Sequence, residues 1–246
     1  MRYFAVRNLK EMLRDRLTLF FGLVFPLIIL VLLYILNLNI PTAAGMTLFE
    51  LENLAPGIAV FGLSFIALFG GMLIARDRSE AFLTRLYSSP LRPSDFLAAY
   101  TLPLLPLALG QSLVCLAAAL VLGMDASASG IIMCLASLLP SAVLFVGIGL
   151  LCGSCMTDKQ VGGICGALLT NLSAWLSGTW FSLDLFGKTA KRIIYYLPFA
   201  NAVDAARSAL NGGSDWKKLL IVAIYAASVF VLAVFAFSRQ VNRTRL

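Results

Sequence analysis

The sequence predicts an all-α, polytopic membrane protein, and three observations lead to this fold class. Of the 246 residues, 60% are apolar and only 13% are charged, whereas soluble domains average about 45–50% apolar and about 25% charged residues. The apolar residues gather in runs that reach the roughly 20 residues a membrane-crossing helix needs. No run alternates apolar and polar residues as the strands of a membrane barrel do. These observations exclude a soluble enzyme, a disordered chain and a disulfide scaffold.

Six membrane-spanning helices are expected within a single transmembrane domain that occupies residues 1–246. The charge-free runs place them at Leu17–Leu38, Leu54–Ala75, 96–124, Gly130–Gly153, Val161–Phe181 and 219–238. The first 17 residues are not expected to form a cleavable signal, because the following apolar run is too long and lacks a small-residue cleavage site.

The placement of lysine and arginine predicts that both termini are cytoplasmic. Thirteen of the 19 basic residues fall on that side, and the other six lie between the fifth and sixth expected spans, so the asymmetry follows the positive-inside rule. It also explains the net charge of +7. Nucleic-acid binding is set aside, because no aromatic residues cluster with the basic ones.

Several kinds of chemistry are excluded or weakly supported. The chain has no histidine, which removes Ser-His relays and the H-E-x-x-H metal motif. Cys152 and Cys155 form a single C-x-x-C pair, a weak metal signal that predicts buried thiols instead. Gly187-Lys188-Thr189 looks like the end of a phosphate-binding loop, but Ser182 stands where that motif needs glycine. We expect no catalytic residue, metal or cofactor in this chain.

Residues 1–17 predict an amphipathic helix that lies along the cytoplasmic membrane surface. Its apolar residues recur at helical spacing and its basic residues occupy the other faces. The alternative is a solvated basic extension that only fixes the topology.

Residues 76–90 predict a short cytoplasmic helix. Asp77 can cap it, with Glu80 reaching back from the third helical position. One face is apolar, and Ser88-Ser89-Pro90 ends the helix; the apolar residues are Phe82, Leu83, Leu86 and Tyr87. A loop that only sets topology does not need such a face, so we expect it to dock on a cytoplasmic partner. The alternative is that this face rests on the membrane.

Residues 182–216 predict a re-entrant or interfacial hairpin on the outer side, before the last span. Asn201 can cap a helix that ends at Asn211-Gly212-Gly213. Its apolar positions are Ala202, Val203, Ala206 and Leu210. At 1.5 Å per residue this helix is about 13 Å long, too short to cross a membrane.

Three blocks, residues 7–36, Asp77–Ser94 and Tyr195–Gly212, resemble the ABC type-2 permeases, the membrane subunits of ATP-binding-cassette exporters. The resemblance implies a half-transporter that pairs with a second copy or a related permease. It also implies a separate cytoplasmic ATPase subunit that binds ATP and Mg²⁺. The residues expected to couple the chain to that ATPase are Asp77, Arg78, Glu80, Phe82, Leu83, Arg85 and Leu86. The block departs from the family at Ala81-Phe82, where a Gly-Thr pair is common.

The expected function is therefore a permease of an ATP-driven exporter in the cell inner or plasma membrane. Ion-driven carriers usually keep an ionisable residue deep in the membrane, and the expected spans contain none. An ion-coupled secondary transporter or channel is the alternative, with Asn171 and backbone carbonyls as a sodium site. A lipid-modifying enzyme would need paired acids or a metal cluster, and the sequence shows neither.

Two helical stripes predict a transport path. One holds Phe61, Phe65 and Phe69 of the second span, and the other holds Asn171, Trp175 and Thr179 of the fifth. The alternative is that these side chains only pack against lipid or other helices. Because an unpaired amide is costly in hydrocarbon, Asn171 is expected to face protein or water. The pairs Gly149/Gly153 and Gly162/Gly166 predict close helix packing, within one subunit or between two.

Overall fold

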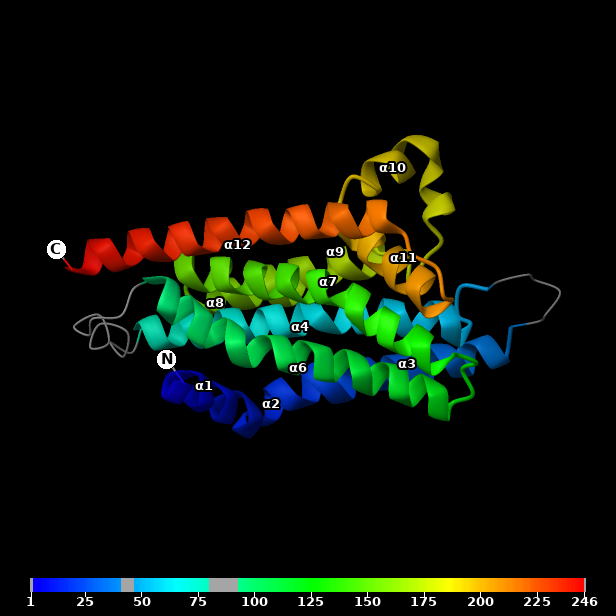
Figure 1. The fold of residues 1–246 in the computed structure, drawn as a ribbon, viewed down its shortest axis with the longest axis horizontal. Helices are drawn as coiled ribbons and strands as arrows, with labels where there is room; N and C mark the ends of the chain where they lie inside the picture. Colours follow the sequence, from blue (N-terminus) through cyan, green and yellow to red (C-terminus); the bar gives the residue numbers. More distant parts are fainter. Residues whose placement is uncertain (1, 41–46, 80–92, 246) are drawn as a thin grey trace.

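A computed structural model describes residues 2–40, 47–79 and 93–245, and every regular element in these ranges is helical (Figure 1). Five helices among the described residues are long and apolar enough to cross a membrane. They are Arg16–Leu38, Leu51–Ser79, Asp95–Val121, Ala128–Cys155 and Trp216–Gln240. The chain is thus an all-helical, multi-pass membrane protein, as predicted.

Fourteen helical elements are assigned within the described residues. In chain order they are α1 (Arg2–Arg14), α2 (Arg16–Leu19), the π-helix η1 (Phe20–Val24), α3 (Phe25–Leu38), α4 (Leu51–Ser79), α6 (Pro93–Val121), α7 (Ala128–Cys155), α8 (Asp158–Val161), the π-helix η3 (Gly162–Leu169), α9 (Thr170–Leu176), the 3₁₀-helix η4 (Leu183–Phe186), α10 (Gly187–Ile194), α11 (Pro198–Leu210) and α12 (Trp216–Arg245).

The fifth expected span is divided into shorter pieces, so the described residues contain five candidate spans and the count of six is not confirmed. α8, η3 and α9 run in sequence from Asp158 to Leu176, and η3 has the wider π-helical winding. The run ends before Gly178, whose φ of 69° suits glycine and does not continue a right-handed helix.

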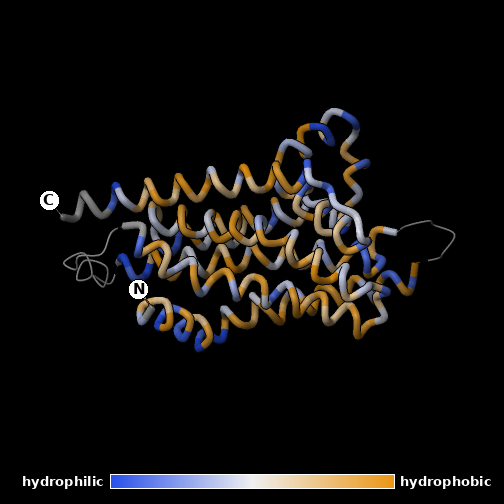
Figure 2. Tube along the Cα trace, viewed as in Figure 1, coloured by the Kyte–Doolittle hydropathy of each residue, from blue (hydrophilic) through white to orange (hydrophobic). Residues whose placement is uncertain are grey.

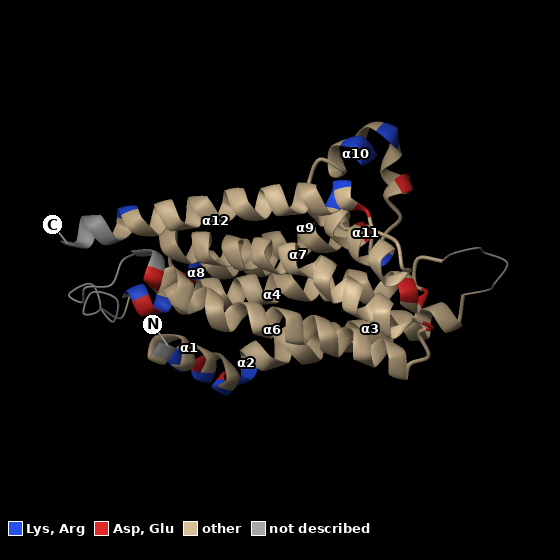
Figure 3. Ribbon diagram, in the orientation of Figure 1, with Lys and Arg blue, Asp and Glu red and all other residues tan. Residues whose placement is uncertain are grey.

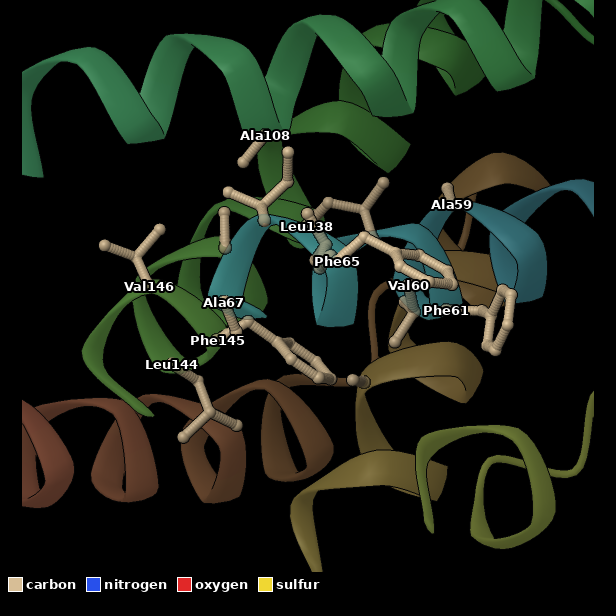
Figure 4. Packing of buried hydrophobic residues seen from close by; sticks show 14 of the residues in the cluster. Ala59, Val60, Phe61, Phe65, Ala67, Ala108, Leu138, Leu144, Phe145 and Val146 are labelled. Carbon is tan, nitrogen blue, oxygen red and sulfur yellow. The ribbon is translucent and has the colours of Figure 1, made fainter. Parts of the chain in front are cut away.

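The helix α4 forms the centre of the bundle. It packs against α6, α7 and α11, and most of its side chains are buried (Figure 4). The approach to α7 is a backbone contact: a Cβ at Gly149 would lie 2.3 Å from the Ala67 carbonyl oxygen, and one at Gly153 would lie 2.4 Å from the Gly71 oxygen. The pair Gly149/Gly153 therefore packs within one chain.

The pair Gly162/Gly166 does not make such an approach within the described part of the chain. A Cβ at Gly162 would meet no heavy atom within 4 Å, and one at Gly166 would be 3.3 Å from the flexible end of Leu68. These glycines lie in η3, where the helix surface is open.

The predicted amphipathic helix at the N-terminus is confirmed as α1, which ends at Arg14 and does not continue to residue 17. Asp15 caps α2 through the Leu17 N–H, so the chain turns there. α1 packs on α6 and buries Asn8 and Met12, while Lys10 and Arg14 are exposed. Apolar and charged positions both recur along this helix (Figures 2 and 3). Its position on a membrane surface remains a prediction.

The expected hairpin of residues 182–216 forms three helices with different surroundings. The predicted apolar positions of α11 are buried in the bundle, where it packs against α4, α7 and α12. The prediction that Asn201 caps this helix is wrong. α11 begins at Pro198, and the Asn201 amide donates to the carbonyls of Tyr195 and Leu197 at 2.8 and 2.7 Å. The helix ends before Gly212, which has a φ of 76°.

Candidate functional site

The end of α4 carries a buried carboxylate. Asp77 is 1% exposed, and three donors from two other helices hold it. Arg7 of α1 donates from both terminal nitrogens, Nη1 to Oδ2 at 3.0 Å and Nη2 to Oδ1 at 2.8 Å. The Tyr100 hydroxyl of α6 donates to Oδ2 at 2.6 Å. One side chain therefore joins α4 to α1 and α6.

The Arg7 guanidinium and the Asp77 carboxylate stabilise each other in their charged forms. A buried carboxylate is tolerated when it is paired and its lone pairs accept hydrogen bonds, and a two-point arginine contact is among the stronger ways to do so. The hydrogen bond to Asp77 raises the pKa of Arg7, although burial acts in the opposite direction. Arg7 also pairs with Glu11 at 3.0 Å within α1. We therefore describe Arg7, Asp77 and Tyr100 together as the Asp77 cluster.

The next residue, Arg78, fastens the same turn of α4 to a different helix. Its Nη1 donates to the carbonyl of Ser154, and its Nη2 donates to the Met156 carbonyl at 2.5 Å. These carbonyls lie at the C-terminus of α7, where helices leave unpaired acceptors and favour a cation. Two consecutive residues thus tie the end of α4 to its neighbours on both sides.

The structure changes one part of the sequence prediction for this segment. α4 continues through Ser79, so Asp77 lies inside a long helix and the prediction that it caps a separate one is wrong. The expected coupling residues Glu80, Phe82, Leu83, Arg85 and Leu86 lie outside the described residues. Asp77 and Arg78 lie in the last turn of α4, directly before that segment in the sequence.

Three residues of the expected transport path lie inside the protein. Phe61 is 4% and Phe65 is 6% exposed, and both are labelled in the core close-up (Figure 4). Their rings contact aromatic neighbours in η1, α3 and the segment after α9, namely Phe21, Phe25 and Trp180. Thr179 is also buried, and it packs so closely on Gly57 that a Cβ there would lie 2.4 Å from its Oγ1.

Phe69 differs from the other two phenylalanines of its stripe. It is half-buried and lines a hollow of about 180 Å³ between α4 and the turn from α1 to α2. Met72 lies beside it, and Glu11, Asp15 and Arg76 supply polar walls. This hollow joins apolar and charged side chains at the end of the bundle that carries the Asp77 cluster.

Asn171 and Trp175 lie on an exposed face of α9, four residues apart. Trp175 is 52% exposed, and the Asn171 amide nitrogen donates to the Ala167 carbonyl at 2.7 Å within its own helical run. The side chain is exposed and does not bond a neighbouring helix in the described part of this chain. A polar amide on an otherwise apolar membrane face needs protein or water beside it.

Sequence reasoning found Asp77 and Arg78 but missed their partners. In the sequence, Arg7 is one of several basic residues of the amphipathic segment, and no pattern singles out Tyr100. A buried aspartate at the end of an apolar helix signals that a cation must come from elsewhere. That signal does not say which of many basic residues supplies it.

Comparison with known proteins identifies a family. A family model described as the ABC-2 type transporter matches residues 1–211, which include every element from α1 to α11. A search of curated proteins found no match.

Proposed function

Because the chain belongs to the ABC-2 type transporter family, we propose that it is the permease subunit of an ATP-driven exporter. ATP hydrolysis takes place in a separate cytoplasmic ATPase that docks on residues 76–90. The observation that carries the proposal is the anchoring of Asp77 and Arg78 at the root of that segment. Because this end of α4 is bonded to α1, α6 and α7, a displacement of it can be transmitted to all three helices.

The contacts support a mechanical role. A displacement of residues 76–90 reaches α1 through Arg7, α6 through Tyr100 and α7 through Arg78. α4 and α7 touch at the backbone near Gly71 and Gly149, and in this proposal they move as one body. Packed elements transmit rigid shifts because interiors resist compression. The proposed coupling thus runs from the ATPase into the centre of the bundle.

We infer that the transport path lies along the exposed face of α9, where a second permease subunit covers it. Asn171 and Trp175 line the path in this proposal. Phe61, Phe65 and Thr179 are buried within the chain. In this proposal they stabilise the helices that form the path and do not line it.

Alanine at Asn171 or Trp175 is expected to change the substrate stimulation of ATP hydrolysis while basal hydrolysis and assembly stay the same. The reason is that these exposed side chains meet substrate and do not hold the fold. Ile224→Ala, which removes an exposed apolar side chain of α12, is the matched control and should leave stimulation unchanged. Lower yield or melting temperature with normal stimulation per folded complex would show that the two residues are structural.

The proposal places both termini in the cytoplasm, in a cell inner or plasma membrane, and six crossings are needed to satisfy the basic-residue pattern. We expect cysteines at Thr47→Cys and Ala128→Cys to react with an impermeant thiol reagent added outside. The prediction of a buried thiol at Cys155 is wrong, because Cys155 is exposed. Cys155 and a cysteine at Ser88 should react only after permeabilisation. Labelling of Ser88→Cys from outside contradicts this topology.

Co-purification tests the proposed function. A tagged copy of the chain should retain a soluble ATPase subunit, and the complex should hydrolyse ATP faster when a transported compound is added. An ion-coupled carrier or channel would instead work alone and respond to an ion gradient. The described spans support the first interpretation, because their acidic and basic residues lie near the helix ends (Figure 3).

A further inference from the structure

The helix α10 stands away from the bundle beside the first turns of α12 (Figure 1). It is held through Ile194, which is buried with Leu183 and Ala200. Around this anchor, large apolar side chains remain uncovered: Leu185 is 77%, Phe186 44%, Ile193 60% and Tyr196 71% exposed. A short helix with so much free apolar surface needs an apolar neighbour.

The exposed side of α10 has a basic edge and an apolar edge. Helical residues advance about 100° per position, so Lys188 and Arg192 share one edge and Ile193 lies on the other. Tyr196, in the turn after the helix, is also exposed. A helix with one basic edge and one apolar edge is typical of a membrane interface, where its cations lie among the headgroups and its apolar edge lies at the acyl boundary.

One contact with α12 indicates the depth of α10. The Lys218 Nζ lies 5.8 Å from the centre of the Tyr195 ring, directly after α10. Lys218 follows Trp216 by two residues, and Trp216 is 72% exposed at the start of α12. An exposed tryptophan at the end of a spanning helix is typical of the membrane–water boundary. α10 therefore lies at headgroup depth.

The charges on α10 are not balanced within the described part of the chain. Lys191 pairs with Asp184 at 2.5 Å, but Lys188 and Arg192 form no ion pair with a described residue. Two free cations at headgroup depth attract anionic lipid.

We propose that α10 binds the headgroups of anionic phospholipids through Lys188 and Arg192, with Ile193 and Tyr196 entering the acyl boundary. This inference depends on the membrane position of the bundle and not on the proposed coupling to an ATPase. It also accounts for two of the basic residues that depart from the positive-inside pattern, because anionic lipid neutralises Lys188 and Arg192, while Lys191, Arg207 and Lys218 pair with aspartates of the chain.

Lipid-selective fluorescence quenching tests the proposal. The full chain with Ile193→Cys and Cys155→Ser is labelled with a small fluorophore and reconstituted in phosphatidylcholine mixed with phosphatidylglycerol. One or the other lipid carries bromine, which quenches only on contact. A label at Ala128→Cys, exposed at the start of α7, is the control for a site in water.

We expect brominated phosphatidylglycerol to quench the label at 193 more than brominated phosphatidylcholine does, and neither to quench the label at 128. Lys188→Gln and Arg192→Gln should each lower the preference for the anionic lipid roughly fivefold, as expected for one interfacial charge. Lys159→Gln, an exposed cation of α8 at the other end of the bundle from α10 (Figure 1), should not lower it.

Two results would overturn the proposal. Equal quenching by both lipids, unchanged in the glutamine variants, would show that α10 has no preference for anionic headgroups. Absence of quenching together with cross-linking between two chains at Ile193→Cys would show that a second copy covers this face.

Discussion

Replacing Arg7 with methionine is expected to lower the free energy of unfolding by about 3 kcal/mol. The substitution leaves Asp77 buried without its cation, and breaking a buried pair in this way costs about 3–5 kcal/mol. The lower end applies because Tyr100 still donates to the carboxylate and Arg7 is 36% exposed, so part of its charge is already solvated. Unfolding in mixed micelles measures the change.

Two variants separate the charge pair from the loss of a side chain. Lys10→Met removes an exposed cation from the same helix and should stay within about 0.5 kcal/mol of the natural protein. Adding Asp77→Asn to Arg7→Met should recover most of the loss, because the amide needs no cation and still accepts from Tyr100. Equal losses in Arg7→Met and Lys10→Met, or no recovery in the double variant, would refute the pairing as a source of stability.

Alanine at Gly149 is expected to destabilise the protein by about 2–3 kcal/mol, the upper range for overpacking. The new Cβ would lie 2.3 Å from the Ala67 carbonyl oxygen, and that backbone atom cannot move without α4. α4 and α7 must then separate and lose contacts along their length. Better helix propensity returns at most about 1 kcal/mol, so the clash dominates.

The matched control is Gly162→Ala in η3. A Cβ there would meet no heavy atom within 4 Å, so only helix propensity acts and stability should be unchanged or slightly higher. Thermal unfolding of the purified chain compares the two variants. If the Gly149→Ala and Gly162→Ala proteins unfold at the same temperature, α4 and α7 are not in backbone contact.

Local patterns predicted much of this fold because hydropathy and helical periodicity are properties of neighbouring residues. The spanning helices, α1 and the buried positions of α11 follow from them. The sequence misplaces the start of α11 because two local signals compete. Asn201 suits a cap, but Pro198 suits the first helical position and determines where the helix begins. Hydropathy places the end of a span before its first charged residue. The predicted span therefore stops before the charged turn at Asp77, although α4 continues through Ser79.

The candidate site required the folded chain. Arg7 and Asp77 are 70 residues apart in sequence, and nothing in either neighbourhood specifies the pairing. The glycines of α7 predicted a close approach but not its partner, which the structure identifies as α4 of the same chain. Phe61, Asn171 and Trp175 recur at helical spacings that fit either a path or a core; burial assigns the first to the core and leaves the other two exposed.

The most direct test of the proposed coupling removes the apolar anchors of residues 76–90. Leu83→Ala with Leu86→Ala should weaken association with the ATPase by about 2 kcal/mol or more, roughly thirtyfold, because buried interface anchors carry much of a binding energy. ATP hydrolysis that remains should no longer drive transport. Leu32→Ala with Leu36→Ala removes the same groups from the exposed face of α3 and should leave association unchanged. A Leu83/Leu86 double variant with normal complex yield and normal transport would contradict the account.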